Sequence, residues 1–206
     1  MRRLRGDARS VGIALLAVAP IMVAVVRALV GHQMPLGDNG LITLRANDVL
    51  TSNHPWFGTW TSASLSTGID FNNPLPLHFD WLAVWVKPFG LAAGSVLGAA
   101  SLNIAAVLLA IRQGWLAAGR RGEALMAMVM TCLSLTLGSE MLTDVWQPHN
   151  LVLPFAAFVA CCIAVAGGRF GSLPWAVGVG SFVMGTHLDR KSTRLNSSHI
   201  PLSRMP

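Results

Sequence analysis

Long apolar runs constrain this sequence more than any other feature. A membrane hydrocarbon core about 30 Å thick needs about 20 mostly apolar residues for each helical crossing. Hydrophobic residues make up 53% of the 206 residues and charged residues only 12%, which is too few charges for a soluble domain of this length. We therefore predict an all-α, polytopic transmembrane helix bundle of about five spans, near residues 11–30, 90–111, 124–142, 151–167 and 173–188.

The last residues, 189–206, differ abruptly from the rest. They run DRKSTRLNSSHIPLSRMP, polar and without an apolar period, and they begin where the fifth apolar run should continue. Back-translation of residues 189–199 matches a common sequencing-library adapter; the alternative is a genuine basic tail. We expect residues 189–206 to be a translated adapter, and residues 1–188 to be an N-terminal fragment of a transmembrane domain that is inactive by itself.

The basic residues predict the topology. Short cytoplasmic loops carry an excess of Lys and Arg, and a cytoplasmic N terminus places most arginines on that side: Arg2, Arg3, Arg5, Arg9, Arg112, Arg120, Arg121 and Arg169. We therefore predict a multi-pass protein of the plasma (inner) membrane, with membrane lipids as partners and no nucleic-acid partner. Most acids and histidines then fall on the outer side, so polar chemistry is predicted at the outer face.

A long outer loop, residues 31–89, is predicted between the first two spans. Loops of this length usually carry function. Gly37 and Asp38 favour a helix start, which would place Arg45 two turns further along the same face. A carboxylate can accept the proton of an alcohol, and a guanidinium can pair with a phosphate. The alternative is a helix cap at Asp38 and a surface pair between Arg45 and Asp48.

Three groups of residues in the outer regions carry a family resemblance. The first loop contains Gly37-Asp38-Asn39-Gly40, TLRANDV from Thr43, His54-Pro55 and FNNPLP from Phe71; later come EMLTDVWQPHN from Glu140 and GSFVMGTH from Gly180. In this order they resemble motifs of the GT-C superfamily of integral membrane glycosyltransferases, in particular an actinobacterial-type polytopic group. The chain departs from the group's pattern at Thr43, Asn73 and Leu75, where the group often has an acid, His and Gly.

The resemblance implies transfer of a sugar from a polyprenyl-phosphate donor to a glycan or lipid acceptor of the cell envelope, at the outer face of the membrane. It implies Asp38 as the catalytic base and Arg45 as a candidate for binding the donor phosphate. No cofactor is required, although a divalent metal beside Asp38 is compatible with the residues. Further substrate-binding candidates by the same resemblance are Asp48, His54, Asn72, Asp144 and His149.

A second hypothesis is a non-catalytic multi-span transporter or lipid-handling membrane protein. A transporter should carry ionisable residues at mid-membrane, often beside broken helices. The apolar runs here contain few such residues, because the polar residues gather outside them. We therefore favour the glycosyltransferase hypothesis.

Overall fold

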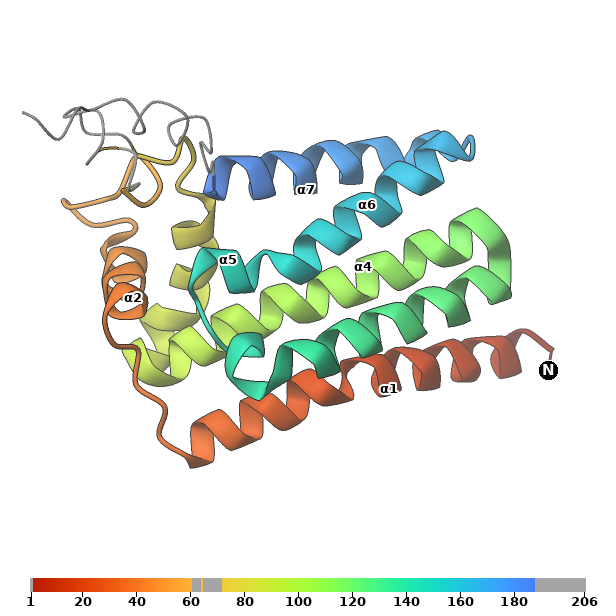
Figure 1. The fold of residues 1–206 in the computed structure, drawn as a ribbon, viewed down its shortest axis with the longest axis horizontal. Helices are drawn as coiled ribbons and strands as arrows, with labels where there is room; N and C mark the ends of the chain where they lie inside the picture. Colours follow the sequence, from red (N-terminus) through yellow and green to blue (C-terminus); the bar gives the residue numbers. More distant parts are fainter. Residues whose placement is uncertain (1, 61–63, 65–71, 188–206) are drawn as a thin grey trace, which may run out of the picture.

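The computed structural model describes residues 2–60, 64 and 72–187, and every regular element in this part of the chain is helical (Figure 1). The predicted all-α class is thereby confirmed, and residues 189–206 lie outside the described residues. The elements are α1 (Arg2–Val30), α2 (Asp38–Asp48), α4 (Leu77–Leu142), α5 (Gln147–Asn150), α6 (Val152–Ala166), the short 3-10 helix η1 (Phe170–Ser172) and α7 (Leu173–Thr186).

Helix α4 is 66 residues long and folds back on itself. Its backbone leaves the helical conformation at Gly90, at Ala118 and Gly119, and at Gly138. The three glycines have φ values of 78°, 60° and 74°, in the left-handed region that glycine adopts without a steric penalty. These breaks separate limbs 77–89, 91–117 and 120–137, and Figure 1 shows the chain reversing direction between the second and third limbs.

The two antiparallel limbs approach each other closely at a pair of glycines. A Cβ atom at Gly122 would lie 2.1 Å from the carbonyl oxygen of Gly114, and a Cβ at Gly114 would lie 2.5 Å from the carbonyl oxygen of Gly122. No side chain fits in either position. Small residues of this kind allow helix backbones to come together where helices pack in an apolar environment.

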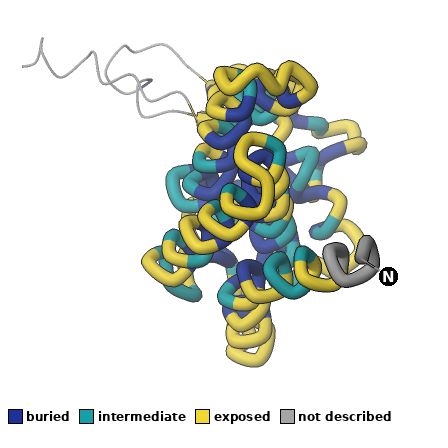
Figure 2. The backbone as a smooth tube through the Cα atoms, turned by 90° about the vertical axis from the view of Figure 1, so that its right-hand side faces the viewer, coloured by how far each residue is buried: buried dark blue, intermediate teal, exposed yellow. Residues whose placement is uncertain are grey.

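Alanine is the commonest residue where α1, α4 and α6 meet. The shared core includes Ala17, Ala24, Ala28, Ala100, Ala106, Ala110, Ala127, Ala157 and Ala160, with Ile21, Val107, Met130 and Leu153. The outer side of α1 is apolar as well, because Leu15 and Leu16 are 67% and 74% exposed. Figure 2 shows buried residues facing the interior of the helix bundle and exposed residues on its outer sides. An apolar exterior of this kind is compatible with a lipid environment.

Three helical stretches are long and apolar enough to cross a membrane by length and composition: Ala8–Val30, Leu77–Leu142 and Gln147–Ala166. Figure 1 places the N terminus, the reversal of α4 and η1 at one end of these helices, with α2 and α5 at the other end. Apolar helices compatible with a membrane are thus present, although only three stretches of the described residues meet this criterion and the sequence predicted about five spans. The two ends of these helices carry different elements.

A second apolar cluster attaches α2 to the start of α4. Ile42 and Ala46 on α2, and Val49 directly after it, are buried in the same cluster as Phe79 and Leu82 on limb 77–89. The predicted helix start at Asp38 is confirmed by the bounds of α2, and this contact gives α2 a defined position.

Trp81 belongs to the same limb and is half-buried. Its Nε1 donates hydrogen bonds to the carbonyl oxygen of Gly98 and to Ser101 Oγ, each at 3.1 Å, which joins limb 77–89 to limb 91–117.

Replacing Gly122 by alanine tests the close approach of the two limbs. We expect Gly122→Ala to destabilise the fold by about 1–3 kcal/mol, because the added methyl group overlaps the backbone of Gly114. Gly178→Ala in α7 is the matched control, since nothing lies within 4 Å of its Cβ position and alanine favours a helix. The midpoint of thermal unfolding in detergent measures both variants. Equal midpoints for the two variants would contradict the proposed contact.

Candidate functional site

An open pocket of about 230 Å³ lies at the end of the bundle that carries α2. It is lined by Leu36, Asp38, Asn39, Asp144 and Trp146. Two of the predicted site residues, Asp38 at the start of α2 and Asp144 from the segment after α4, therefore face the same space. The structure brings together carboxylates that lie more than 100 residues apart in the sequence.

Asp38 is the first residue of α2 and is exposed. Its side chain does not cap the helix: the N-cap residue is Gly37, with a φ of 57°, and no side-chain hydrogen bond closes the helix start. The cap interpretation of Asp38 is therefore wrong. Next to it, Asn39 also lines the pocket, while its Oδ1 is buried and has no hydrogen-bond partner among the described residues.

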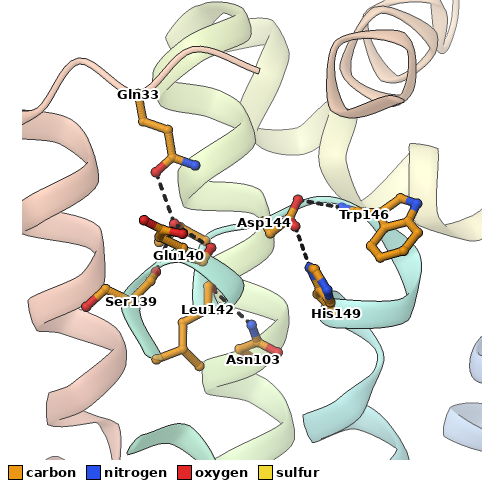
Figure 3. Close-up of polar contacts among 9 residues, drawn as sticks. Gln33, Asn103, Ser139, Glu140, Leu142, Asp144, Trp146 and His149 are labelled. Atoms are coloured by element: carbon orange, nitrogen blue, oxygen red, sulfur yellow. Dashed lines mark hydrogen bonds and ion pairs between the residues drawn. The ribbon is translucent and has the colours of Figure 1, made fainter. Parts of the chain in front are cut away.

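Asp144 is held by two hydrogen bonds that employ both of its carboxylate oxygens (Figure 3). Oδ1 accepts the backbone N–H of Trp146 at 3.0 Å, and Oδ2 lies 2.6 Å from His149 Nδ1. The Trp146 ring meets the His149 ring edge-on, with 4.7 Å between the ring centroids. When Nδ1 carries the proton, it donates a hydrogen bond to Asp144 Oδ2, and this bond fixes the orientation of the imidazole. His149 is thus tied to the pocket through Asp144.

The position of Asp144 depends on contacts at the end of α4. After the break at Gly138, the chain turns, and the carbonyl oxygen of Leu142 accepts a hydrogen bond from Asn103 Nδ2 at 3.1 Å. Thr143 Oγ1 donates to Gln33 Oε1 at 3.2 Å, which ties this turn to the segment that leaves α1 (Figure 3). Because the same segment leads directly into α2, these contacts bring Asp144 next to Asp38.

Arg45 and Asp48 form the surface pair that was the alternative interpretation of their spacing. Arg45 NH1 lies 3.8 Å from Asp48 Oδ2, and the two side chains are 59% and 34% exposed. Neither residue lines the pocket. Arg45 lies seven residues after Asp38, about 10 Å further along the helix. A role of Arg45 in phosphate binding stays a prediction.

His54 and Asn72 lie in the segment between α2 and α4 and do not line the pocket. His54 Nδ1 accepts the backbone N–H of Leu50 at 3.0 Å, where the chain leaves α2 with a φ of 62° at Leu50. The His54 ring also meets the Trp56 ring edge-on, at 4.6 Å between centroids. Asn72 is exposed and forms an isolated antiparallel bridge with Trp60. In this structure the His54 contacts shape the loop.

A buried polar network that the sequence did not predict joins this loop to α5. Asn73 is 2% exposed, and its Nδ2 donates to Thr59 Oγ1 at 2.8 Å. Gln147 Nε2 donates to the same Thr59 oxygen at 2.9 Å. The only sign of this network in the sequence was Asn73 itself, which departs from the family pattern at that position. The network places the start of α5, and with it His149, against the outer loop.

The sequence also did not predict that His78 is buried. It is 2% exposed, its Nε2 lies 3.2 Å from Asn150 Nδ2, and its ring lies 6.4 Å from the ring of Phe182. His78 lies on limb 77–89, before the break at Gly90 and outside the span that the sequence predicted near residues 90–111. Burial in apolar surroundings lowers the pKa of His78 to about 4, so the imidazole is neutral at pH 7.

Metal binding was left open by the sequence. The described residues contain no group of three or more His, Cys, Asp or Glu side chains suited to a metal. Asp38 and Asp144 are two carboxylates at one pocket, and Mg²⁺ is often bound by one or two carboxylates together with substrate phosphates. A divalent metal therefore stays a prediction.

No family model, curated protein or solved structure matched this chain. The interpretation of the site consequently depends on its residues, their geometry and the motifs in the sequence.

Acid should destabilise the fold through His78. The folded pKa of about 4 lies below the ordinary value of 6.5. The unfolded chain therefore binds the proton more readily, and stability is lost as the pH falls from about 6.5 towards 4, by an amount on the order of 3 kcal/mol.

Thermal unfolding midpoints at pH 7 and pH 4.5 measure this loss. We expect a smaller loss for His78→Gln, which does not titrate, than for the wild type. His187→Gln, at an exposed position, is the control and should behave like the wild type. The same acid-induced loss in all three proteins would remove His78 as the cause.

Proposed function

We propose that this chain belongs to an integral membrane glycosyltransferase of the GT-C type. It would transfer a sugar from a polyprenyl-phosphate donor to a glycan or lipid acceptor of the cell envelope. The observation that carries the proposal is the pocket at one end of the apolar helices, where Asp38 and Asp144 from two separate sequence motifs meet.

The topology of the proposal has five crossings and a cytoplasmic N terminus. The crossings are α1, limbs 91–117 and 120–137 of α4, α6 and α7. This arrangement puts the arginines near the N terminus, near the reversal of α4 and before η1 on the cytoplasmic side, as the positive-inside rule favours. The pocket then opens at the outer face of the plasma membrane, where a polyprenyl-linked sugar and a cell-envelope acceptor can meet.

The side chains around the pocket suit a sugar. The carboxylates of Asp38 and Asp144 are acceptors for hydroxyl groups. Trp146 and Leu36 supply apolar surface for the C–H faces of a ring, with Trp146 37% exposed. A pocket rich in acceptors and bounded by an indole favours a ligand that brings O–H donors.

Asp38 is the proposed base of the reaction. Its exposed carboxylate would accept the proton of the acceptor hydroxyl as that oxygen attacks the anomeric carbon of the donor. The bond between the anomeric carbon and the phosphate oxygen breaks, and polyprenyl phosphate leaves with the electron pair. Arg45, two turns along the same face of α2, is the candidate that pairs with the donor phosphate.

The transporter hypothesis finds less support. The breaks in α4 lie at the ends of its apolar limbs, at Gly90, Gly119 and Gly138. Asn103 is a polar side chain in the middle of limb 91–117. It donates a hydrogen bond to the carbonyl oxygen of Leu142, so it stabilises the turn at the end of α4.

Replacing Asp38 by asparagine tests the proposal. We expect Asp38→Asn to lower glycosyl transfer by about 10²–10⁴-fold, because the amide cannot accept the proton, while membrane insertion and thermal stability stay unchanged. Transfer of radiolabelled sugar from a polyprenyl-phosphate donor in membranes measures the effect. The protein used in the assay is expressed from the gene itself, with the reading frame after Leu188 taken from genomic sequencing.

Asp80→Asn is the matched control, since Asp80 is another acid of the outer region that does not line the pocket. It should retain transfer. Full turnover by Asp38→Asn would remove Asp38 from its proposed role, and wild-type membranes without transfer would contradict the proposed function itself.

A further inference from the structure

The end of the bundle opposite the pocket carries its own set of polar side chains, which the proposed function does not use. Arg112 and Gln113 lie near the end of limb 91–117, and Arg169 lies between α6 and η1. Both arginines are exposed. We call these three residues, with Ser172 and Trp175, the basic end.

Hydrogen bonds and a ring contact bring the segments of the basic end together. Ser172 Oγ donates a hydrogen bond to Gln113 Oε1 at 2.5 Å, which joins η1 to α4. The backbone N–H of Ser172 donates to the carbonyl oxygen of Arg169 at 2.9 Å. The guanidinium carbon of Arg112 lies 6.0 Å from the ring centroid of Trp175 on α7. Arg112, which precedes Gln113 in the chain, and the backbone of Arg169 therefore lie near the contact between Gln113 and Ser172.

Gln113 provides an independent indication of a ligand. Its side chain is fully buried, and its Nε2 has no hydrogen-bond partner among the described residues. A buried N–H group without an acceptor is costly, so such groups are almost always paired. Guanidinium groups and this amide nitrogen are donors only. A ligand that satisfies them must offer acceptor oxygens and carry negative charge.

Exposed aromatic residues at the same end indicate where that ligand comes from. Trp115, Phe170 and Trp175 are 51%, 72% and 50% exposed. Tryptophan is enriched where helices leave the hydrocarbon core and meet the lipid headgroups. The anionic groups at that depth are the phosphates of lipids, and basic pockets between membrane helices bind such headgroups.

We propose that Arg112, Arg169 and the side-chain amide of Gln113 form a binding site for the phosphate of an anionic membrane lipid. The guanidinium groups neutralise the phosphate, and Gln113 Nε2 donates to one of its oxygens. Trp175 packs beside Arg112 and covers the acyl-chain side of the headgroup. This site lies at the opposite end from the pocket, and it does not depend on the glycosyltransferase proposal.

Lipid titration of the purified chain in detergent tests this site. The probes are phosphatidylglycerol, which is anionic, and phosphatidylcholine, which is not, and native mass spectrometry measures the dissociation constant of each. We expect tighter binding of phosphatidylglycerol. Arg112→Gln combined with Arg169→Gln should weaken that binding about thirtyfold, since each basic residue near an anionic headgroup contributes about a factor of five. Lys87→Gln, which removes an exposed charge at the other end, should have no effect.

Two further measurements separate this site from a structural role and from a site for free phosphate. Gln113→Leu should weaken phosphatidylglycerol binding several-fold without lowering the unfolding midpoint, because leucine fills the same space without a donor. A lower midpoint with unchanged lipid binding would make Gln113 purely structural and overturn the proposal. Equal binding of the two lipids would also overturn it, as would displacement of phosphatidylglycerol by millimolar inorganic phosphate.

Discussion

The reversal of α4 is the constraint on which the rest of the structure depends. In an apolar environment the backbone must satisfy its own hydrogen bonds, so a helix changes direction only where a few residues tolerate unusual torsion angles. Gly119 allows the reversal, and the contact between Gly114 and Gly122 lets the two limbs lie against each other. The chain after Gly138 therefore returns to the end where α2 lies, and Asp144 comes back to Asp38.

At the end that carries α2, apolar contacts alone specify the relative positions of the helices only loosely, because alanine-rich helix faces can slide past one another at little cost. Polar contacts fix these positions more closely. Asn103 donates a hydrogen bond to one carbonyl oxygen of the turn after Gly138, and Thr143 donates one to Gln33. Since a buried polar group without its partner is costly, each of these bonds favours one relative position of the segments. The pocket thus depends on hydrogen bonds that are remote from its lining.

The two ends of the bundle differ in their chemistry. The pocket at the end with α2 presents acceptors from Asp38 and Asp144, whereas the other end presents donors from Arg112 and Arg169. A ligand rich in hydroxyl groups suits the first end, and an anion suits the second. The fold therefore places acceptor groups at one end of its apolar helices and donor groups at the other, and each proposal uses one of these ends.

The sequence by itself determined the features that depend on neighbours along the chain. The apolar runs predicted the helices, Gly37 and Asp38 predicted the start of α2, and the spacing of Arg45 and Asp48 allowed for their surface pair, because these features follow from helix geometry and local conformation. The predicted runs from 90 and from 124 reappear as limbs of α4, although the glycines that bend it were not singled out.

Only the tertiary structure decided which of the predicted residues meet. It joined Asp38 to Asp144 at one pocket and left Arg45, His54 and Asn72 outside its lining. It also buried Asn73 and His78, which the sequence placed in a wet outer loop. These outcomes depend on contacts between segments far apart in the chain, and the energy of such a contact is set by packing and desolvation that no local pattern records.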